Sequence, residues 1–585
     1  MIQVEKLSYG FPAKDLYREI SFKLEIGQHC ALIGSNGTGK STLVDMIIHP
    51  DDYLYDGKIT KDERCRIGYA SQFCVRDIAQ ERTVLEYLGE RFLDNQRDIA
   101  QVCEAMATAG EEIDSLLERY QTLLDVHDAM DGDNFQSNIK KQLYVARMGD
   151  LEKTKLSQIS GGEYKVMQIM REMLLAPNLL VLDEPDVFLD FGNLNSLCQL
   201  INQYKGTLLV VTHNRYLLNH CFDKVLHLEN EDIQEYDGNY TEYRCSILKE
   251  KLKLKLQNVA EQEKIMHTAE MVDILRKRAT VMVNPVIGRS VNAKQSQLDR
   301  LRMRQIKAPF IEMRKPYIQL PTVNIDPDHE GDLKSTVLTI KDYQVKFDKS
   351  ILENVDFQLL AGEKVAIVGA NGTGKTTLIS DILENKHPSI HIDENVSYRC
   401  LSQRQGENID ENKTVYEIML DEGFPAKELI REYLAKYCLE GETLDQKAGK
   451  LSGGEQNLLQ IAMIAISGAE LLIMDEPTSH LDIYAQIALE NAIANYKGTI
   501  LMVTHDFYLV ANCADYVLLI EDNTVRRMRT RTFRKMVYDK YFDQRYLEID
   551  KKKQELEGDI TVAFKKNDLE TVEKLCNQLE ELSQE

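Results

Sequence analysis

Short apolar runs occur twice along the chain in the same order. Residues 29–33 and 179–183 form the first pair of runs, and residues 364–368 and 471–475 form the second. Apolar runs of about five residues, without polar alternation, are typical of strands buried on both faces of a parallel sheet. The pattern therefore predicts an α/β fold class, with two copies of a domain in which helices cover a mostly parallel sheet.

Between the two copies the apolar residues change to helical spacing. They recur within residues 243–280, a stretch that contains neither Pro nor Gly, at Leu248, Leu252, Leu256, Val259 and Met266. A helix of this length would extend about 57 Å. The pattern breaks at residues 281–289 and returns with Leu298 and Leu301. We therefore expect a long antiparallel helical hairpin with an apolar, arginine-flanked tip, the structural alternative being that this tip packs back on one of the domains.

The first apolar run of each copy is followed by a glycine-rich loop that suits a polyphosphate. The loops read GSNGTGKS and GANGTGKT, and each opens a predicted helix. This arrangement lets successive backbone N–H groups surround phosphate at the positive end of the helix. We expect Lys40 and Lys375 to reach the β- and γ-phosphates of ATP, and Ser41 and Thr376 to offer hydroxyls to Mg²⁺. The residues expected to bind ATP through these loops are Gly34, Ser35, Asn36, Gly37, Thr38, Gly39, Lys40, Ser41 and Thr42 in the first copy, and Gly369, Ala370, Asn371, Gly372, Thr373, Gly374, Lys375, Thr376 and Thr377 in the second.

The second apolar run of each copy ends in two carboxylates. Asp183 and Asp475 end the predicted strands, where they would complete the Mg²⁺ site. Glu184 and Glu476 follow directly and are placed to polarise the attacking water. A packing loop beside ordinary strand-end acids is the alternative, but two intact sets in the same order favour ATP hydrolysis.

Two further motifs carry a resemblance to a known family. A Ser-Gly-Gly-Glu segment precedes the acids of each copy, and a histidine, His213 or His505, follows them. With these motifs the chain resembles the ABC-type ATPases over nearly all of its 585 residues, and within them the twin-cassette ABC-F proteins. The resemblance implies a catalytic role for both histidines. It also implies that the signature residues of the two copies contact ATP, namely Ser160, Gly161, Gly162 and Glu163, and Ser452, Gly453, Gly454 and Glu455.

In that family the two domains, here called cassettes, close head to tail. Each ATP then lies between the glycine-rich P-loop of one cassette and the signature of the other. Site 1 would join Lys40, Asp183, Glu184 and His213 to residues 452–454. Site 2 would join the P-loop, acids and histidine of the second cassette to residues 160–162.

Four other residues take their roles from the resemblance alone. Gln72 and Gln403 resemble the glutamines that sense the metal and the water, and Phe347 and Phe11 resemble the aromatic residues that stack on adenine. Without the resemblance, they would be interpreted as surface glutamines and core rings.

The two copies differ in length. Lys40 and Ser160 are 120 residues apart, whereas Lys375 and Ser452 are 77 residues apart. Nearly all of the excess follows Thr83 and predicts an inserted helical arm near residues 91–129. Family members use such an arm against the large ribosomal subunit.

The two copies also differ in sequence beside the acids. Asp186, Val187 and Phe188 stand where the second copy has Thr, Ser and His. We therefore expect unequal coupling between the two sites. Arg215, where the second copy has Phe507, is a further difference that the sequence alone does not explain.

Charge is distributed unevenly along the chain. The formal net charge is −23, but residues 241–320 contain 17 Lys and Arg against 8 Asp and Glu. This balance of +9 leaves −32 for the remainder, so one basic projection extends from acidic cassettes. Such a protein suits a single defined contact with RNA, although a charge-rich helix can also be only a solvated face. The residues expected to contact RNA are Arg276, Lys277, Arg278, Met282, Val283, Val286, Ile287, Arg289, Arg300 and Arg302.

The composition favours a cytoplasmic protein. No stretch approaches the roughly 20 apolar residues of a membrane helix, and the first residues lack the pattern of a signal peptide. The 11 cysteines include no Cys-x-x-Cys pair and are interpreted as reduced core residues. We expect a monomer without a membrane partner, in which the two cassettes pair within the chain.

These patterns predict four parts and one principal function. The parts are a first cassette at 1–240, a linker hairpin at 241–322, a second cassette at 323–542 and a helical extension at 543–585, where apolar residues again have helical spacing. The resemblance implies that the linker enters the ribosomal exit site and contacts large-subunit rRNA and the peptidyl-site tRNA. Antibiotic resistance by ribosome protection is the favoured role, and a housekeeping translation factor is the alternative. The ATPase subunit of an exporter is a third reading, from a different class.

Overall fold

The computed structural model describes most of the chain as two compact units. The described residues are 2–11, 14–62, 65–72, 81–108, 113–187, 189–281, 285–304, 315–321, 335–346, 350–385, 387–402, 409–541, 549, 552–553, 555–556, 558–560, 562–563, 566 and 568–584. One unit contains Met1–Glu235 and Arg314–Phe542, which include both cassettes, and the other contains Tyr236–Met313 and Asp543–Glu585.

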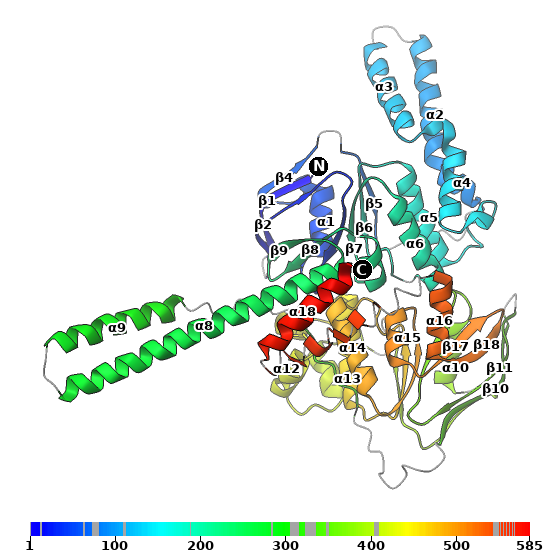
Figure 1. The fold of residues 1–585 in the computed structure, drawn as a ribbon. Helices are drawn as coiled ribbons and strands as arrows, with labels where there is room; N and C mark the ends of the chain where they lie inside the picture. The colour runs from blue at the N-terminus through cyan, green and yellow to red at the C-terminus, as the bar shows by residue number, and fades with distance from the viewer. Residues whose placement is uncertain are drawn as a thin grey trace. The chain divides into compact units, whose positions relative to one another are not determined.

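The first cassette is built on a six-stranded sheet with the strand order β5-β6-β7-β3-β8-β9 (Figure 1). Its strands are β3 (His29–Ile33), β5 (Ile67–Ala70), β6 (Leu179–Asp183), β7 (Thr207–Val211), β8 (Lys224–Glu229) and β9 (Asp232–Asp237). The five strands from β5 to β8 in this order pair in parallel. A three-stranded antiparallel sheet, in the order β2-β1-β4, is formed by β1 (Ile2–Phe11), β2 (Lys14–Leu24) and β4 (Asp56–Lys61).

The second cassette repeats this plan. Its six-stranded sheet has the order β14-β15-β16-β12-β17-β18 and its smaller sheet the order β11-β10-β13. The strands are β10 (Thr336–Lys346), β11 (Ser350–Leu360), β12 (Lys364–Gly369), β13 (Ile390–Ile392), β14 (Tyr398–Leu401), β15 (Leu471–Asp475), β16 (Thr499–Val503), β17 (Tyr516–Glu521) and β18 (Thr524–Arg529). The predicted fold class is confirmed, since both apolar runs of each copy are central strands of a largely parallel sheet.

Helices pack beside these sheets, and several begin where a motif lies. The first cassette contains α1 (Lys40–Ile48), α5 (Gly161–Leu174), α6 (Phe191–Gln203) and α7 (Arg215–His220). The second contains α10 (Lys375–Glu384), α11 (Val415–Asp421), α12 (Lys427–Ala435), α13 (Gly453–Ile466), α14 (Ile483–Asn495), α15 (Phe507–Cys513) and α16 (Thr530–Tyr541). The signature segments are also helix starts. Ser160 and Glu163 form a capping box at α5, as Ser452 and Glu455 do at α13, which satisfies backbone N–H groups that have no partner within the helix.

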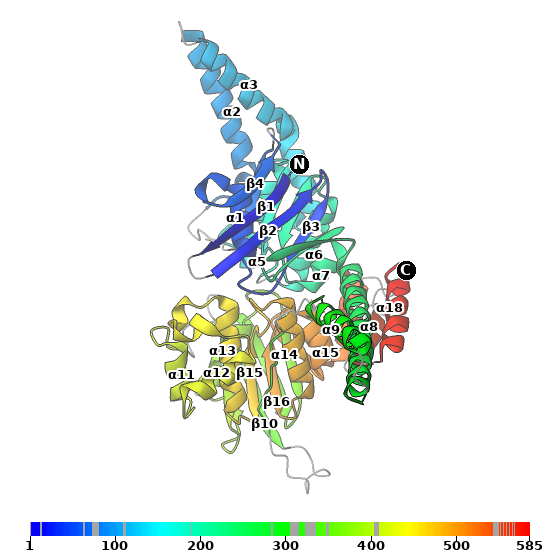
Figure 2. The same cartoon turned by 90° about the vertical axis from the view of Figure 1, so that its left-hand side faces the viewer.

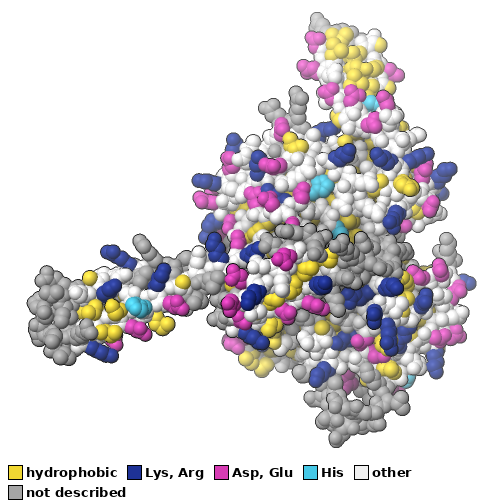
Figure 3. All heavy atoms as spheres, in the orientation of Figure 1, with side chains coloured by type: hydrophobic (Ala, Val, Ile, Leu, Met, Phe, Trp, Pro, Cys, Tyr) yellow, Lys and Arg dark blue, Asp and Glu magenta, His cyan; other side chains and the backbone are white. Residues whose placement is uncertain are grey.

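The first cassette has the helical arm expected from the excess length. Helices α2 (Val84–Thr108) and α3 (Ile113–Ala129) lie side by side (Figures 1 and 2). Helix α4 (Phe135–Val145) follows them (Figure 1). The Asn95 amide donates to the Leu123 carbonyl across the pair at 3.2 Å. Apolar side chains remain exposed on the arm at Leu93, Ile113 and Leu117, among acidic groups (Figure 3).

The second unit contains the linker helices and the C-terminal helix. Helix α8 (Tyr240–Val281) pairs with α9 (Pro285–Arg304), and the Arg276 guanidinium donates to Oε1 of Gln295 at 3.0 Å. The expected break at residues 281–289 is wrong in extent, because α9 already begins at Pro285. Proline fits the first turn of a helix, where its missing N–H has no intrahelical partner.

The C-terminal helix packs on the base of this hairpin. Buried residues of α18 (Leu569–Gln584), namely Val572, Cys576 and Leu579, join Cys245 and Leu252 of α8 in one apolar cluster. The helical spacing in the tail therefore reflects burial against α8. Among the described residues, none of the helices combines the length and the apolar character that crossing a bilayer requires.

Candidate active site

Both P-loops depend on a glycine at the start of the following helix. Gly39 and Gly374 are the N-cap residues of α1 and α10, with φ of 94° and 87°. A Cβ atom on Gly39 would lie 2.7 Å from the hydroxyl of Tyr17, and one on Gly374 would lie 2.9 Å from Cγ2 of Ile351. Backbone conformation and close approach thus both require glycine, which leaves the loop N–H groups accessible to a phosphate.

The lysine of each P-loop is held over the loop. Nζ of Lys40 donates to the carbonyls of Gly34 and Ser35 at 3.0 and 2.9 Å. Nζ of Lys375 makes the equivalent bonds at 3.0 and 2.7 Å. Burial lowers the pKa of both lysines, while neighbouring carboxylates oppose that shift. An ammonium group has three donors, so this position suits a polyphosphate that accepts a further bond.

The residues around Asp183 fit a divalent cation. Oδ1 of Asp183 is buried and has no hydrogen-bond partner among the described residues, and Ser41 bonds to the same carboxyl group. Burial raises the pKa of Asp183, which a nearby cation would reverse. In the part of the chain that the structure describes, no cluster of three or more His, Cys, Asp and Glu residues could hold a metal by itself. The donor set is instead one carboxylate and one hydroxyl, which suits a Mg²⁺ ion that also binds phosphate oxygens.

The two candidate bases have the same unusual backbone. Glu184 and Glu476 have φ of 45° and 48°, and their backbone N–H groups donate to the carbonyls of Val211 and Val503 at 2.9 and 2.8 Å. Positive φ in a residue with a side chain is strained and is common where a catalytic group must be aimed. Burial raises the pKa of Glu184 to about 7 and that of Glu476 to about 8. Values near neutrality suit a group that takes a proton from water.

The two bases differ in their partners. Gln72 donates from Nε2 to Oε2 of Glu184 at 2.5 Å. The backbone N–H of His505 donates to Oε2 of Glu476 at 3.2 Å, and its Nε2 lies 3.7 Å from Oε1. Burial lowers the pKa of His505 to about 3, so its neutral ring contacts Glu476 without forming an ion pair. Neither ring nitrogen of His213 has a hydrogen-bond partner within the described ranges.

At site 1 the P-loop of the first cassette meets the second cassette. Nδ2 of Asn36 donates to the carbonyl of His480 at 2.8 Å, and its backbone N–H donates to Oδ2 of Asp482 at 3.1 Å. A Cβ atom on the signature glycine Gly454 would collide with the Asn36 amide. Lys40 of this P-loop and Gly454 of the opposite signature therefore belong to one site.

At site 2 the same contact is made with the roles of the cassettes exchanged. The backbone N–H of Asn371 donates to Oδ2 of Asp190 at 3.1 Å, and a Cβ atom on Gly162 would lie 3.0 Å from Nδ2 of Asn371. A cavity of about 430 Å³ is lined here by the second P-loop, the first signature and both histidines, His213 and His505. Small-molecule sites have volumes in this range.

Asp190 and Asp482 contact the opposite P-loops, and the sequence reasoning missed them. Each caps a helix, α6 or α14, through Oδ1 and accepts a bond from the opposite P-loop through Oδ2. Their signal in the sequence is their equal position in both copies, seven residues after the strand-end aspartate.

Lys165 is a second residue that was missed, and it is present only in the first cassette. Its Nζ donates to the carbonyls of Gln72 and Glu184 at 3.2 and 2.9 Å, whereas Asn457 of the second cassette donates to Pro477 and Ser479. Asp186, where the second cassette has Thr478, accepts a bond from Thr212 at 2.5 Å. Its charge contributes to the raised pKa of Glu184. The first cassette thus has one added cation and one added anion beside its base.

Several predicted site residues are not assembled with the others or lie outside the described ranges. Phe11 is 52% exposed at the end of β1, where it pairs with Lys14 of β2 and its ring makes an edge contact with Tyr9. Phe347, Gln403 and Phe188 lie outside the described residues. The hairpin residues Arg276, Lys277 and Arg300 are exposed on α8 and α9. Met282 and Val283 are not among the described residues, and the side chains of Arg278, Val286, Ile287, Arg289 and Arg302 are not described either.

Comparisons with known proteins agree with the twin-cassette plan. A family model described as ABC transporter matches residues 17–187 and 352–479, and a second model with the same description matches residues 226–320. YdiF of Bacillus subtilis is 29% identical over 581 residues, covering 97% of this chain and 87% of that protein. The energy-dependent translational throttle protein EttA of Haemophilus influenzae is 27% identical over 521 residues, covering 87% and 89%. ABC transporter F family member 2 of Arabidopsis thaliana is 28% identical over 539 residues, covering 89% and 76%.

A solved structure shares the fold. The structure titled RNase-L Inhibitor matches with a TM-score of 0.53 and 16% sequence identity, covering 92% of each chain. At this identity the likeness concerns the twin-cassette architecture alone.

Proposed function

Since the chain belongs to the ABC transporter family, as a twin-cassette ATPase of the ABC-F type, we propose that it is a ribosome-binding ATPase acting on the peptidyl-site tRNA and the peptidyl-transferase centre. One observation carries this proposal. Each P-loop contacts the opposite cassette, through Asn36 and Asn371, in a chain that also contains a long basic hairpin. ATP binding closes the cassettes and favours insertion of the hairpin, and hydrolysis releases the protein. Both sites form within one chain, which therefore acts as a monomer.

The chemistry of each site follows from its groups. Lys40 and Lys375 hold the β- and γ-phosphates, and the signature of the opposite cassette encloses the γ-phosphate. Ser41 with Asp183, and Thr376 with Asp475, would hold Mg²⁺, and a bound Mg²⁺ would neutralise charge on the phosphate oxygens. The buried Glu184 and Glu476 accept a proton from the attacking water. Gln72 orients Glu184 through its amide.

Two roles on the ribosome are compatible with these features, namely antibiotic resistance by ribosome protection and control of translation. The length and basic charge of α8 and α9 favour ribosome protection against an antibiotic, because a long hairpin can reach a drug site in the large subunit. The similarity to a protein named translational throttle favours control of translation instead. An exporter subunit would require a membrane partner and gives the basic hairpin no role.

A trapped variant tests ribosome binding. Glu184→Gln with Glu476→Gln retains ATP binding and slows turnover by about 10²-fold or more. It is expected to co-sediment with ribosomes in ATP and to inhibit translation. The matched control, Lys40→Ala with Lys375→Ala, removes phosphate binding and is expected to stay in the supernatant. Equal sedimentation of the trapped, control and unaltered proteins would reject ATP-gated entry.

Cells then separate the two roles. Expression of the full chain is challenged with antibiotics that bind the large subunit, alongside a chain in which residues 281–289 are replaced by a short Gly-Ser turn. Protection that depends on residues 281–289 supports the resistance role. Equal protection by the full chain and by the chain with the replacement would contradict a role of residues 281–289 in resistance. If the full chain gives resistance to none of these drugs, and the replacement impairs translation on stalled messages, the translation-factor role is supported.

A further inference from the structure

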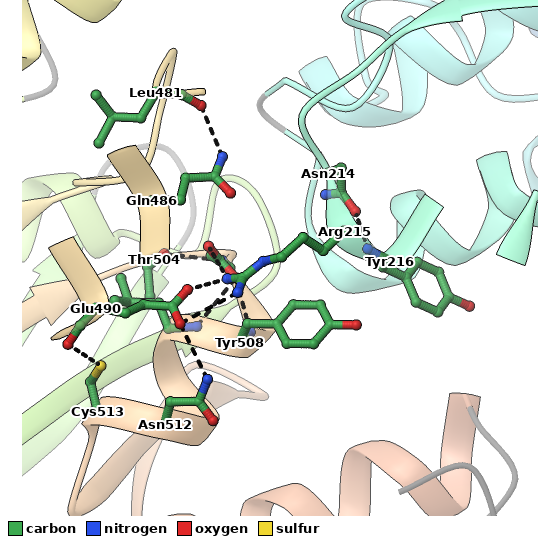
Figure 4. A network of polar contacts seen from close by, with 12 residues as sticks. Asn214, Arg215, Tyr216, Leu481, Gln486, Glu490, Thr504, Tyr508, Asn512 and Cys513 are labelled. Atoms are coloured by element: carbon green, nitrogen blue, oxygen red, sulfur yellow. Dashed lines mark hydrogen bonds and ion pairs between the residues drawn. The ribbon is translucent and has the colours of Figure 1, made fainter. Parts of the chain in front are cut away.

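A buried ion pair joins the two cassettes beside the ATP sites. The Arg215 guanidinium donates to both carboxylate oxygens of Glu490, by a close contact to Oε1 and at 3.4 Å to Oε2 (Figure 4). The two side chains are only 10% and 9% exposed. A carboxylate oxygen of Asp506 lies 3.8 Å from the same guanidinium, and the ring of Tyr508 lies under it, 4.3 Å from centroid to Cζ. Nδ2 of Asn512 also donates to Oε2 of Glu490, at 3.2 Å.

Arg215 and Asp506 closely follow the two histidines along the chain. Arg215 is the first residue of α7, two positions after His213. Asp506 directly follows His505 and caps α15 through its side chain. Glu490 is on α14, the helix that begins after the P-loop contact of Asp482. A single arginine of the first cassette therefore contacts both the histidine loop and α14 of the second.

Because the two cassettes repeat one plan, each contact across the interface has a counterpart in which the cassettes are exchanged. The counterpart of the Arg215 contact contains none of these charges. Helices α6 and α14 both have 13 residues and begin after a capping aspartate, so their positions correspond. The corresponding pairs, with the charged member first, are Arg215 and Phe507, Glu490 and Cys198, and Asp506 and Asn214. On the uncharged side Phe507 makes an edge contact with Phe191 at 5.9 Å between ring centroids. The ionic contact is therefore one-sided within a repeated architecture.

Packing alone does not require these charges. Burying an ion pair costs desolvation that its attraction often only offsets, and apolar residues of similar volume commonly serve as well. The uncharged side, with Phe507 against Phe191, is such an apolar solution in the same molecule. Removing one partner of a buried pair is different, because it leaves the other charge without compensation. When the cassettes separate, both charges return to water, whereas in the closed arrangement each charge is compensated mainly by the other, so loss of either partner disfavours closure.

We propose that Arg215, Glu490 and Asp506 form a one-sided ionic latch that couples the two histidine loops when the cassettes close. Arg215, which lines the cavity at site 2, is thus a positioning residue for ATP hydrolysis that acts through the His213 and His505 loops. The latch makes turnover at one site depend on closure at the other. The inference concerns the isolated ATPase and does not depend on ribosome binding, so the two proposals can fail separately.

The test measures ATP turnover by the purified full chain as a function of ATP concentration. The unaltered protein is expected to respond cooperatively, with a Hill coefficient above about 1. Arg215→Met leaves Glu490 buried beside Asp506 and is expected to raise the half-saturating ATP concentration about tenfold or more. Arg215→Lys keeps the charge but loses the bidentate geometry, and is expected to recover part of this loss.

A triple variant separates coupling from packing. Arg215→Phe with Glu490→Cys and Asp506→Asn gives the latch side the residues of the uncharged side. If the latch couples the sites, half-saturation returns to within about threefold of the unaltered value while the Hill coefficient falls to about 1. If the pair is only packing, both values return to those of the unaltered protein.

Three results would overturn the proposal. They are a non-cooperative unaltered protein, an unchanged ATP dependence in Arg215→Met, and a triple variant that stays fully cooperative. Unfolding temperatures measured without nucleotide show whether each variant folds. Should Arg215→Met not fold, Glu490→Gln takes its place, since it leaves Arg215 beside Asp506 and is expected to weaken closure in the same direction.

Discussion

Gly162, in the signature of the first cassette, is expected to tolerate an added methyl group less well than the neighbouring Gly161. A Cβ atom on Gly162 would lie 2.7 Å from Nδ2 of Asn193 and 3.0 Å from Nδ2 of Asn371, which belongs to the opposite P-loop. A Cβ atom on the neighbouring Gly161 meets nothing within 4 Å. Both glycines lie in the first turn of α5, so Gly161→Ala is a matched control with a similar change in helix propensity.

The size of the effect of Gly162→Ala depends on which of these two contacts is lost when the cassettes separate. Overpacking costs about 1–3 kcal/mol. The contact with Asn193 is within one cassette and affects the open and closed states alike, whereas the contact with Asn371 exists only when the cassettes are closed. Gly162→Ala is therefore expected to raise the ATP concentration for half-maximal turnover about 5- to 150-fold. Gly161→Ala is expected to leave that concentration nearly unchanged.

The assay isolates the affected site. Both alanine substitutions are placed in a Glu184→Gln background, which leaves site 2 as the main source of turnover. Phosphate release is measured against ATP concentration, and the unfolding temperature without nucleotide is measured as a control for folding. Equal ATP requirements for the two variants, with both folded, would mean that the approach of the signature to Asn371 does not limit closure, and would refute this reasoning.

Three other predictions concern separate parts of the chain. Glu184→Gln alone and Glu476→Gln alone are expected to leave different residual turnover, since the acids beside the two bases differ, and equal rates in a phosphate-release assay would contradict this. Leu579→Ala is expected to cost about 2–5 kcal/mol of local stability and to speed amide exchange in α18, whereas Val562→Ala, at an exposed position, should change it little. Replacing residues 281–289 by a Gly-Ser turn should leave ATPase activity intact, and a large loss of turnover would show that the tip supports the cassettes.

Much of the fold could be predicted because its signals are local. A P-loop places strand, glycine turn, lysine and helix start within a few neighbouring residues, so Lys40 and Lys375 could be assigned before any tertiary contact was known. The linker was predictable for the same reason, since a long run without Pro or Gly favours one continuous helix, and α8 covers the predicted stretch from residue 243 to residue 280. The apolar spacing marks burial only in part, because Leu252 is buried whereas Met266 is exposed. The confirmed fold class follows from the repetition of these local patterns.

The bounds of the hairpin tip and the burial of Glu184 were not predictable. The sequence signals for the first conflict, and the second has no local signal in the sequence. The tip of the hairpin was placed too broadly, since Pro285 can end one helix or begin the next, and only the backbone geometry distinguishes the two. The raised pKa of Glu184 depends on burial and on Asp186, and the sequence does not contain the degree of burial.

The amino-acid sequence by itself determined the two cassettes, their P-loops and signatures, and the helical linker, because each is encoded by neighbouring residues. The tertiary structure decided which distant groups meet. Arg215 and Glu490 are 275 positions apart, and Asn36 and His480 are 444 apart, so no periodicity or spacing relates them. Arg215 alone had no interpretation as a charged residue where the second copy has Phe507. It acquires one from the packing of two similar cassettes, because a buried cation requires an anion within reach and only the folded chain supplies Glu490.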